Sequence, residues 1–585
     1  MATTPTAVPT AAAPSAPHYP EQVTGMYILA KALKNIGITD MYGLVGIPVT
    51  DFSYLCQEQG IRFVGFRHEQ QAGMAAATHG YVTGKPGVLL TVSSLGFLNG
   101  LTATINATVN CYPMIQISGS SQRAPIDLSQ GAYEGLDQLN VAKGLVKAAY
   151  RVNEPKDIPT AVARAYRAAI SGRPGGVYLD ITTPCLGQVV DAKEAESWFF
   201  TPVDPEARTM ANAESITRAV ELLKSAKRPA IVLGKGAAFI QADETVKEFV
   251  ETTGVPFFPM SMAKGLMPDN HPLSALACRS TIMEQADVVV LIGARLNWLL
   301  SRGHGKWNPE GKFIQLDVEA TEMDCNRPIA APVVGDVASS MKAMIAQLRG
   351  AKMSMDPTWV PSLAAETKTK NAKFAERLAS FANTQPMTHW TALNALKPIL
   401  EAEENRDIIL VNEGANTLDD TRDTIDMFVP RHRIDCATWA IMGMGMGSVI
   451  GAAVATGNRV VAIEGDSAFG FSGMDVSTIC RFKLPCTVVI FNNGGIYNGI
   501  GVNLAKNGDP APTTLDINAR YEKVGEAFGA AAYYVSTPEE LTKAFTEAIA
   551  SRKPAIINVQ LAADSGKESG HIGYLNPESI QHVIV

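Results

Sequence analysis

Residues 460–470 read VVAIEGDSAFG, and residues 488–499 read VVIFNNGGIYNG. In both stretches a run of β-branched and apolar residues, typical of a buried strand, ends in a short polar turn. A segment of helix length separates the two runs, so the pattern predicts two parallel strands joined by a helix. The carboxyl ends of parallel strands form the edge at which ligands bind, and Asp466 and Asn493 would both lie there.

The residue types in these two turns suit a small, hard cation that also binds phosphate. The carboxylate of Asp466, the amide oxygen of Asn493 and the main-chain carbonyl of Gly495 are oxygen ligands of the kind that Mg²⁺ takes in proteins. Gly465 and Gly494 would let the backbone approach a diphosphate closely. From the spacing alone, two ordinary strand-to-helix turns without a ligand remain the alternative.

The same alternation of β-branched runs and Ala-rich helical segments continues along the chain, and it predicts an α/β protein with doubly wound parallel sheets. A chain of 585 residues is too long for one core, and three blocks of similar size suggest three Rossmann-like domains. We expect a flexible tail at 1–19, domains at 20–190, 205–352 and 386–560, a linker at 353–385, and a C-terminal segment at 561–585.

Composition excludes several classes of protein. The net charge is −7 and no run of Lys or Arg occurs, so we expect no nucleic-acid partner. No apolar stretch of about 18 residues is free of helix breakers, so we expect no membrane span. The eight cysteines lack CxxC spacing, and residues 1–17 lack the apolar core of a signal peptide. These features predict reduced thiols and a cytoplasmic location.

The Gly-Asp pair at 465–466, followed by the Asn-Asn pair at 492–493, resembles the diphosphate-binding motif of enzymes that depend on thiamine diphosphate (ThDP) and Mg²⁺. The family usually has glycine at the position of Ser467, but the aspartate that binds the metal is kept. The resemblance implies a set of cofactor-binding residues, namely Ile47, Glu69, Ala440, Met442, Asp466, Ser467, Ala468, Asn493 and Tyr497.

Residues 437–453, ATWAIMGMGMGSVIGAA, resemble the family segment that places a bulky apolar residue beneath the cofactor. Met442 is the matching position. The alternative is that Met442, Met444 and Met446 only fill the core. Glycine at every second position disfavours a helix interior in this stretch.

Glu69, in the sequence HEQQAG, lies between a predicted strand and a helix of small residues. An acidic residue in a first helical turn is favoured by the helix dipole, which is the purely structural interpretation. In the ThDP enzymes a glutamate in this setting lies beside the pyrimidine ring and exchanges a proton with it, so the resemblance implies a catalytic role. It also implies a homo-oligomer, because the family binds its cofactor between the first domain of one subunit and the third domain of another. A dimer is the minimum, and many relatives are tetramers.

Within this family the motifs are most similar to those of the oxalyl-CoA decarboxylases, and next to those of the 2-hydroxyacyl-CoA lyases. The similarity lies in Ile47, the pair Tyr133 and Glu134, Tyr497, and Ser569 in the C-terminal sequence ESGHIGYLNP. It implies decarboxylation of oxalyl-CoA to formyl-CoA and CO₂, with the tyrosines, Glu134 and Ser569 orienting the substrate and the C-terminal segment closing over it. Ordinary interface packing is the alternative for the two tyrosines.

Gly135 is a departure from the oxalyl-CoA decarboxylases, which usually have an acidic residue after the Tyr-Glu pair. Glycine removes a side chain and a charge and frees the backbone. We therefore hypothesise a wider or more mobile wall of the active site, which would favour ligation of formyl-CoA with an aldehyde.

The second block contains GKGAA, GARLNW and LDVEA after successive predicted strands, and these resemble a nucleotide cradle. By family resemblance the occupant would be ADP, an activator, bound by Arg173, Lys235, Arg295 and Asp317. A purely structural domain is the alternative. For coenzyme A the candidate contacts are Arg279, Ser280, Asn416, Arg422, Ser569 and Gly570, although the arginines could instead form surface ion pairs.

Two other classes of protein stay open. In flavin-containing relatives such as acetohydroxyacid synthase the second domain carries FAD, so a flavin-bearing carboligase is one of them. A non-catalytic nucleotide-binding relative is the other, and the presence of Glu69, Asp466 and Asn493 argues against it.

Overall fold

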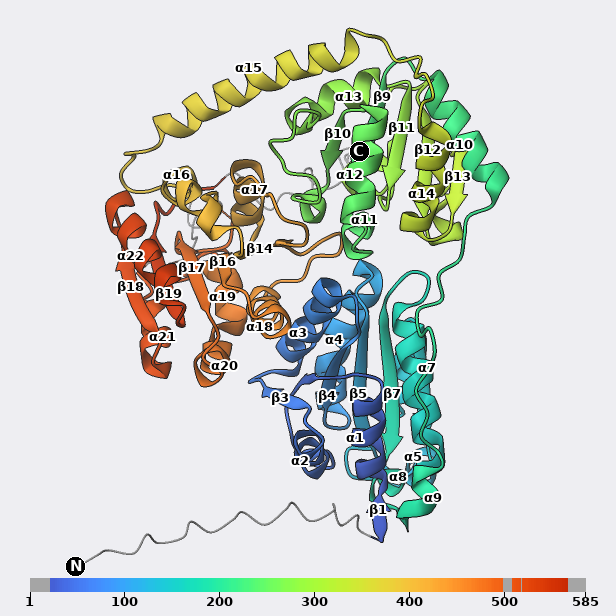
Figure 1. Cartoon of the computed structure of the whole chain (residues 1–585). Coiled ribbons are helices and arrows are strands. Elements are labelled where there is room, and N and C mark those ends of the chain that lie inside the picture. The colour runs from blue at the N-terminus through green and yellow to red at the C-terminus, as the bar shows by residue number, and fades with distance from the viewer. Residues whose placement is uncertain (1–20, 498–507, 517, 567–585) are drawn as a thin grey trace, which may run out of the picture.

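The computed structural model describes residues 21–497, 508–516 and 518–566. Three separate parallel sheets with helices on their faces follow one another along the chain (Figure 1). This arrangement confirms the predicted fold class of three α/β domains with parallel sheets. Of the strands in these parallel sheets, β6, β10, β13, β15 and β18, whose bounds follow, were not predicted, and each of them lies at an edge of its sheet.

The N-terminal sheet has the strand order β3-β2-β4-β5-β7-β6. Its strands are β2 (Asp40–Gly43), β3 (Arg62–Gly65), β4 (Gly87–Thr91), β5 (Met114–Ser120), β6 (Ala148–Val152) and β7 (Gly176–Thr182). The main helices are α1 (Gly25–Asn35), α2 (Thr50–Glu58), α3 (Glu69–Thr83), α4 (Leu95–Asn110) and α7 (Ile158–Ile170). A short antiparallel pair, β1 (Gln22–Thr24) with β8 (Val189–Asp191), joins the start of this domain to its end.

The middle sheet has the order β10-β9-β11-β12-β13. Its strands are β9 (Pro229–Leu233), β10 (Phe257–Pro259), β11 (Val288–Ile292), β12 (Lys312–Asp317) and β13 (Ala331–Val334). Its helices include α10 (Ala213–Ser225), α11 (Lys235–Phe239), α12 (Asp243–Thr253), α13 (Arg279–Gln285) and α14 (Val337–Leu348). The segment predicted as a linker contains one long helix, α15 (Trp359–Ser380), which runs from the middle domain to the C-terminal domain (Figure 1).

The C-terminal sheet has the order β15-β14-β16-β17-β19-β18. Its strands are β14 (Ile409–Glu413), β15 (Arg433–Ile434), β16 (Val460–Gly465), β17 (Cys486–Asn492), β18 (Ala531–Val535) and β19 (Ala555–Gln560). Its helices include α16 (His389–Leu400), α17 (Ala415–Thr424), α18 (Gly445–Thr456), α19 (Asp466–Ser472), α20 (Val476–Arg481), α21 (Glu522–Phe528) and α22 (Pro538–Ser551).

Helices α3 and α18 pack side by side and join the N-terminal and C-terminal domains in one shared core (Figure 1). A Cβ atom on Gly447 would lie 2.5 Å from the carbonyl oxygen of Gln71, and one on Gly451 would lie 2.3 Å from that of Ala75. Only glycine allows this backbone approach, because real Cβ contacts are longer. The expectation that alternating glycines disfavour a helix here was therefore wrong from Gly445 onwards, since packing against α3 outweighs the low helix propensity.

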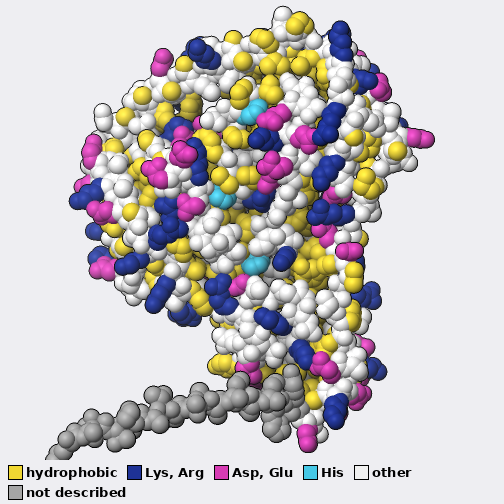
Figure 2. All heavy atoms as spheres, in the orientation of Figure 1, with side chains coloured by type: hydrophobic (Ala, Val, Ile, Leu, Met, Phe, Trp, Pro, Cys, Tyr) yellow, Lys and Arg dark blue, Asp and Glu magenta, His cyan; other side chains and the backbone are white. Residues whose placement is uncertain are grey.

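The face of the molecule drawn in Figure 2 carries interspersed basic and acidic side chains. In the described part of the chain, no helix combines the length and the hydropathy that a membrane span requires. The eight cysteines all lie in the described residues, and all of them are free.

Candidate active site

The turns after β16 and β17 lie together, as the sequence predicts. The two strands pair in parallel, with Gly465 opposite Phe491. Asp466 is the first residue of α19, and its carboxylate accepts hydrogen bonds from the backbone N–H of Ser467 and of Gly494, both at 2.8 Å. The second of these bonds ties one turn directly to the other.

Asn493 is buried beside Asp466 in the second turn. Its Oδ1 accepts the N–H of Gly495 at 3.3 Å, and its Nδ2 donates to the carbonyl of Tyr497 at 2.8 Å. Burial raises the pKa of Asp466 to about 6, so a cation bound at this position would favour the charged carboxylate. The carboxylate, the amide oxygen and the carbonyl of Gly495 form an oxygen donor set that fits Mg²⁺.

Two buried glutamates that were not predicted lie beneath residues 443–445, next to Met442. Glu413 and Glu464 are opposite each other on β14 and β16. Glu413 accepts the backbone N–H of Gly443 and that of Gly445, the latter at 2.5 Å, and burial raises its pKa to about 7. Neither carboxyl oxygen of Glu464 has a hydrogen-bond partner among the described residues, and burial together with the Glu413 charge raises the pKa of this group well above the usual value.

Met442 differs from the methionines that follow it. Met444 and Met446 are buried and belong to the core shared with the N-terminal domain, whereas Met442 is 36% exposed. Met442 also lines a cavity of about 1410 Å³, together with Ala440 and Tyr497. The structural interpretation therefore holds for Met444 and Met446, and the position of Met442 suits contact with a ligand.

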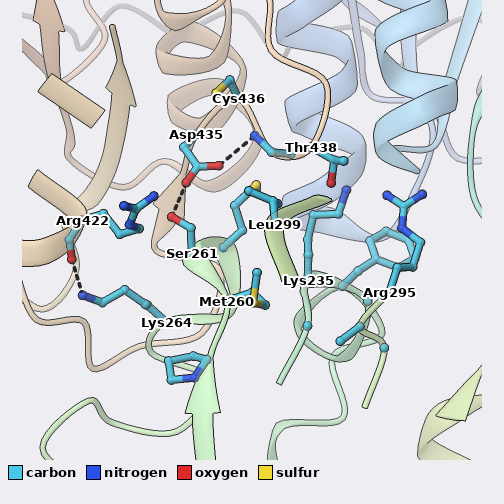
Figure 3. Close-up of a pocket in the computed structure, with 18 of the residues that line it drawn as sticks. Lys235, Met260, Ser261, Lys264, Arg295, Leu299, Arg422, Asp435, Cys436 and Thr438 are labelled. Atoms are coloured by element: carbon cyan, nitrogen blue, oxygen red, sulfur yellow. Dashed lines mark hydrogen bonds between the residues drawn. The ribbon is translucent and has the colours of Figure 1, made fainter. Parts of the chain in front are cut away.

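The same cavity extends to the middle domain, and all four predicted nucleotide contacts line it, Lys235, Arg295 and Asp317 from the middle domain and Arg173 from the N-terminal domain. Figure 3 shows Lys235 and Arg295 in its wall. Arg173 and Arg295 both pair with Glu322, the second at 3.8 Å. Burial lowers the pKa of Lys235 to about 8 and raises that of Asp317 to about 6. Burial therefore disfavours the charged forms of both side chains, and a ligand with complementary groups would stabilise those forms.

Of the predicted coenzyme A contacts, Arg279 and Arg422 line this cavity. Arg279 donates to the carbonyl of Leu299 at 2.5 Å, and Arg422 pairs with Asp419 at 2.9 Å. Ser280 is exposed and does not line the cavity. Asn416 is buried and also lies outside it. Ser569 and Gly570 lie outside the described residues.

Lys264 fixes the end of the helix that carries Arg422, and the sequence analysis did not select it. Its side chain is 3% exposed and reaches from the middle domain to the end of α17. The ammonium group donates to the carbonyl of Arg422 at 2.7 Å (Figure 3). It also donates to the carbonyl of Ile425 at 2.9 Å and pairs with Asp269 at 3.2 Å. A buried cation at a helix C-terminus interacts favourably with the helix dipole and so stabilises the end of the helix.

Glu69 is the first residue of α3 and is 7% exposed. Asn99 donates its Nδ2 to one oxygen of the Glu69 carboxylate at 3.1 Å. A Cβ atom on Gly96 would lie 3.2 Å from the other oxygen, so the glycine leaves space beside it. Asn99 was missed, because its contact with Glu69 depends on how α4 lies against α3.

Ile47 and Tyr133 are among the most exposed large apolar residues, at 67% and 65%. Ile47 lies in the loop after β2, and Tyr133 lies between α5 (Arg123–Asp127) and α6 (Gln138–Lys143), in the connection from β5 to β6. Glu134 accepts the hydroxyl hydrogen of Ser93 at 2.5 Å and adopts a positive φ of 47°. Within the described chain none of these three residues lines the cavity, and neither do Glu69, Asp466, Ser467, Ala468 and Asn493.

The fold and these turns define a class, the ThDP-dependent enzymes, and comparison with known families agrees. Residues 23–141 match the thiamine pyrophosphate enzyme N-terminal TPP binding domain, residues 216–344 match the central domain, and residues 419–559 match the C-terminal TPP binding domain. The chain belongs to the thiamine pyrophosphate enzyme family, thiamine pyrophosphate being another name for ThDP.

Individual proteins of this family are similar to the chain over nearly its full length. The chain is 54% identical to an oxalyl-CoA decarboxylase of Escherichia coli (strain K12), over 96% of this chain and 99% of the relative. It is 40% identical to a 2-hydroxyacyl-CoA lyase of Arabidopsis thaliana, over 95% and 99% of the two chains. It is 36% identical to the human 2-hydroxyacyl-CoA lyase 1, over 95% and 97%.

Proposed function

We propose that the protein decarboxylates oxalyl-CoA to formyl-CoA and CO₂ with bound ThDP and Mg²⁺. The observation that carries this proposal is the 54% identity to the E. coli oxalyl-CoA decarboxylase over nearly the full length of both chains. When bound, ThDP supplies the carbon nucleophile and the electron sink that such a decarboxylation needs. The free cysteines fit a reducing, cytoplasmic compartment.

In this proposal the C-terminal domain holds the cofactor. Asp466, Asn493 and the carbonyl of Gly495 would bind Mg²⁺ and, through it, the diphosphate, because both turns lie at one sheet edge and are linked by hydrogen bonds. Ser467 and Ala468 in the first turn of α19 would contact the phosphates. Met442, with Ala440 beside it, would support the cofactor from the cavity wall.

The N-terminal domain would supply the proton chemistry. Asn99 holds one oxygen of Glu69, which leaves the other oxygen, beside Gly96, to exchange a proton with the pyrimidine ring. Tyr133, Glu134, Tyr497 and Ser569 would orient the substrate carboxylate through hydrogen bonds.

The cavity suits the nucleotide-containing ligands of the proposal. Arg279 and Arg422 line this cavity and would bind coenzyme A, whose phosphates would offset their positive charges. Ser280 and Asn416, which lie outside the cavity, and Ser569 and Gly570, which lie outside the described residues, would contact other parts of the same molecule. ADP would occupy the part lined by Arg173, Lys235, Arg295 and Asp317, as an activator. FAD is less favoured, because the relatives described above are named as enzymes of CoA thioesters.

We also propose that the active unit is at least a dimer. Ile47, Leu95 and Tyr133 are exposed on the N-terminal domain, and Phe471 and Met474 are exposed on the C-terminal domain. Large apolar side chains that one subunit leaves exposed are candidates for burial at an interface. A dimer would cover them, and two dimers would form a tetramer.

The test is to incubate the purified protein with oxalyl-CoA, ThDP and Mg²⁺ and to follow the products by mass spectrometry. We expect formyl-CoA only with both cofactors, and its loss in Glu69→Gln although ThDP still binds. No turnover of oxalyl-CoA, with cleavage of a 2-hydroxyacyl-CoA to formyl-CoA and an aldehyde, would favour the second candidate, a 2-hydroxyacyl-CoA lyase, which the 40% identity supports. A flavin absorption spectrum would point to the carboligase.

A further inference from the structure

Asn110 lies where the three domains meet. It is the last residue of α4 and is 1% exposed. Its main-chain carbonyl accepts a hydrogen bond from the ammonium group of Lys235, which begins α11 in the middle domain. Its side chain binds Thr438 and Trp439 in the C-terminal domain. A single buried residue thus contacts the nucleotide part of the cavity on one side and the methionine-containing segment on the other.

The side-chain amide of Asn110 is fully used. Its Oδ1 accepts the backbone N–H of Thr438 at 3.2 Å and that of Trp439 at 3.0 Å. Its Nδ2 donates to the carbonyl of Trp439 at 3.1 Å and to Asn106 Oδ1 at 3.1 Å, and Asn106 donates to the same carbonyl at 2.8 Å. A buried amide whose donors and acceptors are all paired holds its neighbours in one geometry.

The segment that Asn110 holds leads directly to the cavity wall. Trp439 is followed by Ala440, Ile441 and Met442, which all line the cavity, and Glu413 binds the backbone again at Gly443. The segment 440–442 is therefore anchored at both ends, by an amide from the N-terminal domain and by a carboxyl group from its own domain.

Lys235 is held on the other side of the same junction. Its ammonium group lies 4.2 Å from the centre of the Tyr112 ring, two residues after Asn110. In Figure 3 the Lys235 side chain extends toward Thr438, with Arg295 beside it. An anionic group bound next to Lys235 would act on the ammonium group that holds the Asn110 carbonyl.

We propose that Asn110 is a positioning residue that sets the cavity segment Ala440–Met442 and couples it to the ammonium group of Lys235. The inference rests on the proposed function, in which Met442 supports ThDP and Lys235 faces a nucleotide. It assigns to Asn110 the control of cofactor affinity without contact with the cofactor.

The experiment titrates the cofactor-free protein with ThDP in excess Mg²⁺ and follows the quenching of tryptophan fluorescence, for which Trp439, 49% exposed, is a local reporter. We expect Asn110→Ala to weaken ThDP binding about tenfold, because at least two buried hydrogen bonds are lost. Asn106→Ala removes one donor to the same carbonyl, and we expect about threefold. It carries the test if Asn110→Ala does not fold.

The matched control is Asn405→Ala. Asn405 is also buried and donates to the carbonyl of Ile399 at 2.7 Å, but it does not line the cavity. We expect a similar fall of the thermal midpoint with unchanged ThDP affinity. Equal ThDP affinities in the asparagine variants and in this control would overturn the positioning role.

Coupling is tested by Lys235→Met. We expect it to weaken ThDP binding about threefold in the wild type and to add nothing in the Asn110→Ala background, since the effect passes through that side chain. Additive effects would overturn the coupling. A wild-type protein whose fluorescence does not respond to ThDP would instead overturn the proposed function, which is a distinct result.

Discussion

Glu413 and Glu464 are opposite each other on two adjacent parallel strands, and both carboxyl groups converge on the backbone of Gly445. A Cβ atom placed on Gly445 would lie 2.1 Å from an oxygen of Glu464 and 2.8 Å from one of Glu413. Both side chains are buried, and like charges in such proximity disfavour ionisation. The pair therefore lies directly under the segment that carries Met442 to the cavity.

The first prediction concerns Glu413 and pH. Its pKa in the folded protein is about 7, above the ordinary value of 4.5, so the folded state binds the proton more tightly than the unfolded chain. This contribution to stability is complete below about pH 4.5 and is lost as the pH rises through 7, by up to about 3 kcal/mol. In Glu413→Gln, which cannot ionise, we expect the thermal midpoint of the cofactor-free protein to fall less between pH 5 and 8.

The control for this measurement is Glu526→Gln, which alters an exposed glutamate paired with Lys523. We expect its pH dependence to match that of the wild type, because surface ion pairs contribute little. The same pH dependence in Glu413→Gln as in the wild type would contradict the prediction.

The second prediction separates two buried aspartates. Asp466 and Asp475 both have a pKa raised to about 6 by burial, but Asp475 accepts the backbone N–H of Arg67 at the contact with the N-terminal domain. We expect Asp466→Asn to weaken Mg²⁺-dependent ThDP binding about a hundredfold or more, and Asp475→Asn to leave it within about twofold. In the wild type this binding should weaken as the pH falls below 6, because protons compete for Asp466. Fluorescence titration at several pH values measures both effects, and equal losses in the two variants would refute the metal assignment.

The third prediction compares two lysines at the end of α17. Lys264 is buried and holds the carbonyls of Arg422 and Ile425, whereas Lys397 is more exposed and donates to Thr424 at 2.7 Å. We expect loss of Lys264 to raise KM for the CoA thioester about tenfold with little change in kcat, since Arg422 loses its support. Lys397→Met should change KM less than about twofold.

Lys264→Met alone leaves the buried Asp269 without its cation, which destabilises the fold. The measurement therefore uses Lys264→Met combined with Asp269→Asn, with steady-state kinetics over a range of CoA thioester concentrations. A normal KM in this double variant would show that Arg422 does not depend on Lys264.

The fourth prediction concerns Gly135. A Cβ atom at this exposed position would lie 3.1 Å from the carbonyl of Ala132, and the φ angle is not in the left-handed region, so a side chain fits after a small shift. We expect Gly135→Glu to keep the thermal midpoint and to lower the rate of formyl-CoA ligation with an aldehyde relative to decarboxylation. The two rates are compared by mass spectrometry, and an unchanged ratio would refute the hypothesis of a wider wall.

Local patterns in the sequence predicted those parts of the site that depend on one strand and the turn after it. Asp466, Asn493 and Glu69 each lie where an apolar run ends, and the structure has each of them at a strand end or at the start of the following helix. The parallel arrangement of the strands follows from the same alternation.

The parts of the site that the sequence did not predict depend on contacts between segments far apart in the chain. Glu413 and Glu464 look like ordinary strand-end residues until the pairing of β14 with β16 brings them together. Asn110 lies within an unremarkable run of small and polar residues, and its role depends on the meeting of three domains. Periodicity in a sequence indicates local structure and does not indicate which distant segments come into contact.

The glycines along α18 have a consequence for how this protein can be divided or recombined. The backbone of α18 lies directly against the backbone of α3 at these glycines, so a side chain there would prevent the contact. The two helix surfaces are therefore specific for each other. A fragment that contains only one of the two domains would expose this helix surface, which is normally covered by the other helix, to water. Exchange of domains with a relative would therefore succeed only when both helices are transferred together. The first and third domains, although distant in sequence, would have to be exchanged as one unit.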